Sequence, residues 1–223
     1  MRRLKSGEEV EVQPKTGTVW RAMLIALAVV VVLAAFGIVA GRLGELAEEP
    51  AEALELLSSV SALLAVSFIF LDMTTGSFRP LLNRVFKPGR LQSAHNAFGL
   101  VGFSLALCHF LFLLPAIGEH YEEANRALFF FGPAALVLLA LTIVTALLAA
   151  RLSHSWRVIH LLNYVIFGIA MLHALVIGED RSTPGMLAFF IAFGTVALAG
   201  LIYRLAFTDW RVHFGRVSGS GGR

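Results

Sequence analysis

The chain has 223 residues, of which 57% are hydrophobic and only 15% are charged, and its mean hydropathy is +0.78. Soluble domains are about half apolar and a quarter charged, so this composition excludes an ordinary soluble domain and a disordered chain. A single cysteine excludes a disulfide framework and a cysteine-held iron–sulfur cluster. The net charge of +3 indicates basic loops at a membrane and no nucleic-acid partner.

Six apolar stretches of about 18 to 24 residues are long enough to cross a bilayer as helices. They lie near residues 20–40, 56–73, 91–114, 127–150, 156–178 and 187–207. The apolar core of the first stretch exceeds that of a usual signal peptide, so we expect it to be retained as a helix. The predicted fold class is therefore an all-α membrane protein, a bundle of six transmembrane helices.

The charge distribution orients this bundle. Fifteen of the 18 Lys and Arg residues fall in the N-terminal tail, the second and fourth loops and the C-terminal end, whereas the alternate loops carry most of the acidic residues. Basic loops stay in the cytoplasm, so we expect both termini there and a cell-membrane location. The expected organisation is a cytoplasmic tail over 1–19, a membrane domain over 20–207 and a flexible cytoplasmic tail over 208–223.

Four of the seven histidines fall inside predicted spans, where ionisable side chains are costly and point to function. His95 and His109 lie on the third span, 14 residues or about 21 Å apart along a helix. His160 and His173 lie on the fifth span, 13 residues or about 19.5 Å apart. Because both spans run outward, we expect His95 to meet His160 near the cytoplasm (the inner pair) and His109 to meet His173 at the opposite surface (the outer pair).

Two facing imidazoles suit a haem iron, which takes one axial ligand from each side, better than a lone metal ion, which needs three or four protein ligands. The four histidines therefore predict two b-type haems with all four as iron ligands, and no catalytic side chain is predicted. Arg90 and Arg157 precede the inner histidines by five and three residues. They are candidate partners of the haem propionates, with ordinary loop charge as the alternative.

The spacing of 13 residues places His160 and His173 about 140° apart around an ideal helix. Either the fifth span is irregular or the two haems lie on different flanks of it, and both arrangements stay open. Small residues, Gly99, Gly102 and Gly168, are expected to leave room for the macrocycles. The alternatives to haem are histidines that bridge helices by hydrogen bonds and a transporter with a histidine proton relay.

The stretches HNAFGLVGFSLALCH and HLLNYVIFGIAMLH, with SHSWR before the second, resemble the ferric reductase-like transmembrane domain family. This family also contains the membrane domains of NADPH oxidases, and the resemblance covers roughly residues 56–207. It implies six helices with haem ligands on the third and fifth, at spacings of 14 and 13. It also implies electron transfer from a cytoplasmic flavin through the inner and outer haems to an extracytoplasmic acceptor.

Many members of that family carry a fused flavin and NAD(P)H domain, which we do not expect in this chain. The resemblance therefore implies an oxidoreductase component that depends on a separate cytoplasmic flavoprotein or other electron donor. Two redox alternatives are a haem-binding membrane subunit similar to that of the periplasmic methionine sulfoxide reductase system, and a quinol-linked cytochrome b anchor.

Overall fold

The computed structural model describes residues 50–118, 126–152, 155–177 and 184–207, together with isolated positions between 22 and 33. Within these ranges the chain is almost entirely helical, which confirms the all-α class. The elements are α2 (Pro50–Ser77), α3 (Arg79–Leu82), α4 (Pro88–Leu113), η1 (Leu114–Ala116), α6 (Arg126–Phe129), α7 (Phe131–Leu147), α8 (Ala149–Leu152), α9 (Ser155–His160), α10 (Leu162–Ile177) and α11 (Pro184–Phe207). The two predicted tails lie outside the described residues, as does most of the first predicted span.

Four stretches of the described helices are long and apolar enough to cross a membrane, as expected for a multi-pass membrane protein. They are Ala53–Ser77, Pro88–Leu113, Val158–Ile177 and Pro184–Ala206, and they correspond to the second, third, fifth and sixth predicted spans. The fourth predicted span is an apolar helix of 17 residues, α7, flanked by the short helices α6 and α8.

The outward face of α7 is apolar. Val137 is 68% exposed and Leu147 is 80% exposed, and Leu141 and Val144 lie exposed between them at helical spacing. A contiguous row of large apolar side chains on an otherwise unpaired helix face indicates contact with lipid.

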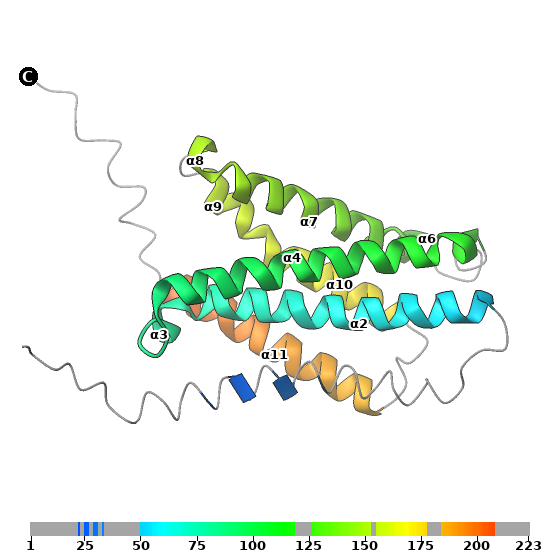
Figure 1. Ribbon diagram of the computed structural model, residues 1–223, viewed down its shortest axis with the longest axis horizontal. Helices are drawn as coiled ribbons and strands as arrows, with labels where there is room; N and C mark the ends of the chain where they lie inside the picture. Colours follow the sequence, from blue (N-terminus) through cyan, green and yellow to red (C-terminus); the bar gives the residue numbers. More distant parts are fainter. Residues whose placement is uncertain are drawn as a thin grey trace, which may run out of the picture.

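Helix α2 is the centre of the bundle. Helix α4 packs along its length, and α10 and α11 contact it from other directions (Figure 1). The close approach of α4 depends on Gly102, because a Cβ there would lie 2.8 Å from Ile69 Cγ1 and 3.1 Å from the Ile69 backbone nitrogen. Small residues allow such close packing between membrane helices.

The interior of α2 is unusually polar for a membrane helix. Ser67 and Ser77 are buried, and their hydroxyls donate to carbonyls four residues back, at 2.8 and 2.6 Å. Asp72 lies on the same helix and is only 9% exposed. Polar groups in such a place must be satisfied inside the protein, so α2 can present partners to the helices around it.

The fifth predicted span is irregular directly after its first histidine. Helix α9 ends at His160 and α10 begins at Leu162. Across this junction the Leu161 N–H donates to the Val158 carbonyl at 3.1 Å and the Tyr164 N–H to the Leu161 carbonyl at 3.2 Å, three residues back in each case. Such bonds wind the chain by about 120° per residue, against about 100° in an α-helix. This tightening brings a spacing of 13 residues closer to four whole turns, so the first of the two arrangements left open by the sequence is observed.

Candidate functional site

The inner pair meets in the structure. The ring centroids of His95, on α4, and His160, at the end of α9, lie 5.8 Å apart with an interplanar angle of 79°. Two metal–imidazole bonds of about 2 Å in line, added to ring radii of about 1 Å, would place the centroids roughly 6 Å apart. The separation of the two ring centroids is therefore compatible with two imidazoles that hold one iron between them.

The imidazole of His95 is held from behind by α2. Its Nδ1 lies 2.7 Å from Asp72 Oδ1 and 3.0 Å from the Asp72 backbone oxygen, with Thr75 Oγ1 at 3.5 Å. The two Asp72 oxygens are acceptors, so Nδ1 donates, and in the neutral imidazole the lone pair is then on Nε2. Metal-binding histidines usually donate their second nitrogen to a carboxylate or a backbone carbonyl in this way.

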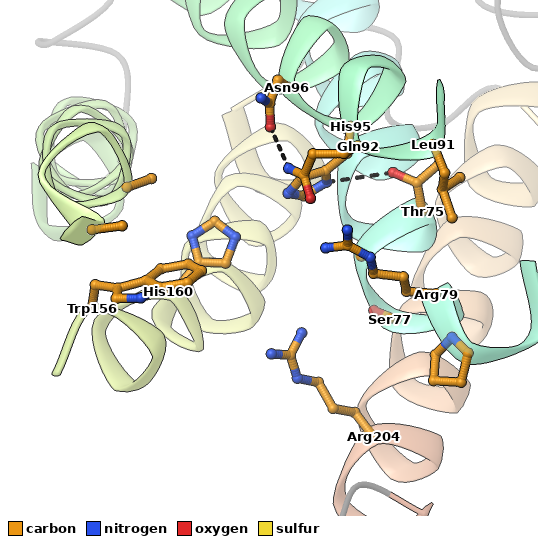
Figure 2. A pocket seen from close by; sticks show the side chains of 14 residues that line it. Thr75, Ser77, Arg79, Leu91, Gln92, His95, Asn96, Trp156, His160 and Arg204 are labelled. Carbon is orange, nitrogen blue, oxygen red and sulfur yellow. Dashed lines mark hydrogen bonds between the residues drawn. The ribbon is translucent and has the colours of Figure 1, made fainter. Parts of the chain in front are cut away.

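A cavity of about 440 Å³ opens beside the two inner rings. Figure 2 shows Arg79 and Arg204 extending toward it from α3 and α11, and Trp156 against His160, with ring centroids 5.7 Å apart. Cavities that bind cofactors and other small molecules measure about 300–1,000 Å³. The cavity therefore combines sufficient volume, two facing imidazoles and two cationic side chains.

His160 has an unsatisfied ring nitrogen. Among the residues that the structure describes, the buried polar atoms without a hydrogen-bond partner are His160 Nδ1, Thr74 Oγ1 and Asn163 Oδ1. Leaving a buried polar atom unpaired costs about 1–3 kcal/mol. His160 therefore differs from His95 and His109, whose Nδ1 atoms contact backbone carbonyls of α2.

The outer pair lies along a second cavity. His109, on α4, and His173, on α10, both line a space of about 120 Å³ whose other walls are almost wholly apolar. His109 Nδ1 lies 3.0 Å from the Ser58 carbonyl and 2.9 Å from its hydroxyl, which in turn lies 3.2 Å from the His109 carbonyl. The second nitrogen is again directed to a backbone carbonyl of α2.

The His173 ring packs against the backbone of α7. A Cβ at Gly132 would lie 2.7 Å from His173 Cε1 and 2.9 Å from Nε2, so only glycine permits this contact. His173 Nδ1 lies 3.4 Å from the Leu128 carbonyl. The carbonyl is an acceptor, so this nitrogen also faces a typical outer partner of a metal-bound imidazole.

The two levels differ in how well they fit a haem. The inner residues fit, since donors, volume and cationic side chains are all present. At the outer level the two donors are present, but the cavity is smaller than cofactor sites usually are, so the helices around it must separate to admit a macrocycle. Within the described ranges, no three His, Cys, Asp or Glu side chains gather as a site for a lone metal ion.

One of the two predicted propionate partners lies away from the inner cavity, and the prediction for the other stays untested. Arg90 is exposed and does not line the inner cavity, and the side chain of Arg157 lies outside the described part of the structure. Arg79 and Arg204 occupy the cavity wall instead. Sequence reasoning grouped both with the cytoplasmic charges and had no signal for which of these would turn inward.

The glycines expected to make room for macrocycles have other neighbours. Gly99 and Gly102 face α2, where an added Cβ would meet Asp72 and Ile69, and Gly168 has nothing within 4 Å. The glycines that touch histidines are Gly132 and Gly76, at which a Cβ would lie 3.3 Å from His95 Cε1. They lie on helices α7 and α2, away from the histidine motif itself.

Comparisons with models of protein families, with curated protein sequences and with solved structures find no match to this chain.

Proposed function

We propose that the chain is a transmembrane electron-transfer protein that binds two b-type haems, one at each histidine pair. It would pass electrons from a cytoplasmic-side donor to an extracytoplasmic acceptor, as the ferric reductase-like family that it resembles does. The observation that carries this proposal is the inner pair, where two imidazoles from different helices face each other at 5.8 Å beside a cavity of about 440 Å³.

At the inner level each side chain has a role that its position supports. When bound, haem supplies a one-electron Fe(III)/Fe(II) couple. His95 and His160 hold the iron from two helices, and Asp72 fixes the ring orientation of His95. Arg79 and Arg204 pair with the propionate carboxylates, because guanidinium groups bind carboxylates in strong charge-assisted hydrogen bonds.

At the outer level the surroundings are apolar. His109 and His173 would hold the second iron once the helices around this small cavity separate, and Ser58 would orient the first of them. The other residues that line the space are apolar or glycine, mainly Ala, Ile, Leu and Phe. Two protein ligands at each iron leave no coordination position open, so the acceptor would be reduced without binding to iron.

The proposal includes six spans with both termini in the cytoplasm of a cell-membrane protein, and a separate cytoplasmic flavoprotein as donor. The acceptor could be a soluble periplasmic reductase, as in the methionine sulfoxide reductase system. A quinol-linked anchor is the remaining redox alternative.

The test is a reduced-minus-oxidised absorbance spectrum of the purified chain with quantification of haem. We expect low-spin b-type bands and about two haems per chain. A colourless protein that takes up no haem on reconstitution would exclude the proposal.

A second candidate, a proton-coupled transporter, is favoured by one observation. Asp72, His95 and His160 form a contiguous row of ionisable groups inside the membrane segments, which is the arrangement of a proton relay. Haem-free protein in vesicles carrying a pH gradient separates the two functions. Proton flux that is lost in Asp72→Asn would support transport. The absence of proton flux through the unmodified chain would support the haem proposal.

A further inference from the structure

The two histidines on α4 differ in the charge of the groups that contact their Nδ1 atoms. His95 Nδ1 lies 2.7 Å from the Asp72 carboxylate, whereas His109 Nδ1 lies 3.0 Å from the neutral carbonyl of Ser58. Both histidines are on α4 and both partners are on α2, with a backbone carbonyl at 3.0 Å in each case. The two contacts therefore differ mainly by one negative charge.

The position of the Asp72 carboxylate is built by its neighbours. A Cβ at Gly99 would lie 3.2 Å from Asp72 Oδ1, so α4 leaves space for the carboxylate one turn after His95. The Thr75 hydroxyl donates to the Asp72 carbonyl at 2.8 Å and fixes the local backbone. A carboxylate inside a membrane segment is costly, so its contact with one selected histidine calls for a role.

We propose that Asp72 is a positioning residue that lowers the reduction potential of the inner site below that of the outer site. This inference rests on the haem binding proposed above. A carboxylate that accepts from Nδ1 makes the imidazole a stronger donor through Nε2, which favours Fe(III) over Fe(II). Each site exchanges one electron, and no bond is made or broken. Arg79 and Arg204 line the cavity, where they would pair with the propionates, whereas Asp72 contacts the proposed ligand His95 directly.

A lower potential at the inner site gives electron flow a direction. An electron that arrives from the cytoplasmic flavoprotein enters at the lower potential and moves outward to the higher one. The driving force for outward electron transfer would then depend in part on a single side chain on α2, a helix that carries no proposed haem ligand.

The experiment is a potentiometric titration of the haem-loaded chain with dithionite, followed by the b-type absorbance bands. We expect two waves in the unmodified chain, and His109→Leu identifies the inner wave because only that wave survives. In Asp72→Asn the lower wave should move to more positive potential while the upper wave stays in place. Asp72→Glu, which keeps the charge, should restore most of the original separation.

Two further variants keep the test independent of folding. Gly99→Ala retains the carboxylate but displaces it by a few tenths of an ångström, so it should move the same wave in the same direction by less. Ser58→Ala, the matched change at the outer pair, removes only a neutral hydroxyl and should leave the lower wave unmoved. Unchanged potentials in Asp72→Asn and Gly99→Ala, or equal movement of both waves, would overturn the assignment to Asp72. A colourless unmodified chain would overturn the haem proposal as well, so the two failures are distinguishable.

Discussion

The inner and outer histidine pairs come from the same two predicted spans but lie in different surroundings. The inner pair adjoins a cavity of about 440 Å³ lined by arginine, asparagine, glutamine and threonine side chains, and one histidine contacts a carboxylate. The outer pair adjoins a space of about 120 Å³ with almost wholly apolar walls and neutral partners. Matched histidine pairs in the sequence therefore do not produce equivalent sites.

The difference arises from the side chains that the neighbouring elements supply, because both pairs lie near span ends: His109 and His173 each lie four residues before the last residue of their apolar spans. Charged side chains are tolerated at the end of a span, where they reach water or a polar surface. The inner site can hold Arg79, Arg204 and Asp72 because α2, α3 and the last turn of α11 converge there. The outer site must orient its imidazoles with backbone carbonyls, which need no charge.

The largest test of this comparison removes one ligand from each pair. His95→Leu and His109→Leu should each lower haem content from about two to about one per chain, but their stabilities should differ. His95→Leu leaves the Asp72 carboxylate without its partner, which costs about 3–5 kcal/mol for a buried pair. His109→Leu leaves the hydroxyl and the carbonyl of Ser58 without the His109 imidazole as a hydrogen-bond partner. We expect this to lower the free energy of unfolding by about 1–3 kcal/mol. Haem quantification and unfolding midpoints measure both effects.

Equal losses of stability in these two variants would contradict the electrostatic difference between the pairs. Loss of both haems in His109→Leu would contradict the independence of the two sites. A His120→Leu variant, outside the proposed pairs, is the control for haem content.

The second test acts on the outer pair alone. Gly132→Val should abolish or strongly reduce the outer haem, because its Cβ would lie 2.7 Å from the His173 ring and would push that imidazole out of its position. Overpacking of this kind typically costs about 1–3 kcal/mol. Gly168→Val is the matched control, since nothing lies within 4 Å of a Cβ at Gly168. The absorbance spectrum should lose the outer signal and keep the inner one, and loss of the inner signal instead would refute the placement of His173.

The sequence predicted most of the long helices but not the contacts between them. Apolar length predicted the second, third, fifth and sixth spans, and the 13-residue spacing predicted that an irregular fifth span was one of two solutions. The partners Asp72 and Ser58 could not be assigned, because contacts between helices depend on rotation about the helix axis, which periodicity alone does not fix. Asp72 carried the only available signal, a carboxylate at the end of an apolar span.

The arginines show the same limit. Positive charge near the inner histidines predicted propionate partners, and nearness along the chain favoured Arg90 and Arg157. The cavity wall instead takes Arg79 from the loop side and Arg204 from the last turn of α11, far away in sequence. Residues close in sequence to a ligand lie on the same helix as that ligand. A macrocycle between helices would contact side chains from several helices, including ones that are distant in sequence.

The third test compares the arginines on the cavity wall with an arginine that is close to His95 only in sequence. Arg79→Gln and Arg204→Gln should each weaken haem retention at the inner site by about tenfold or more, since a charge-assisted hydrogen bond is worth about 1.5–3 kcal/mol. Arg90→Gln, an exposed position outside the cavity wall, should leave retention unchanged. Haem transfer to an excess of apomyoglobin measures the loss, and the outer haem serves as an internal reference. A larger effect for Arg90 than for Arg79 would restore the interpretation from sequence.

The smallest expected effect concerns the hydrogen bond that joins α10 to α2 near the inner pair. Tyr164 lies just after the break in the fifth span, and its hydroxyl donates to Ser77 Oγ, which itself donates to the Met73 carbonyl at 2.6 Å. This bond joins α10 to α2 a single turn beyond His160. Hydrogen bonds between membrane helices are worth about 0.6 kcal/mol on average, so Tyr164→Phe should weaken inner haem retention by about threefold.

Ser77→Ala should have the same effect as Tyr164→Phe, and the double variant should be no worse than either single change, because the two substitutions remove one shared bond. The outer haem should be retained as before, since His173 is held by α6 and α7 and not by this contact. Equal loosening of both haems would mean that α10 moves as one rigid rod. The break at Leu161 predicts the opposite, because a junction with only three-residue hydrogen bonds lets the segment bearing His160 respond separately from the segment bearing His173.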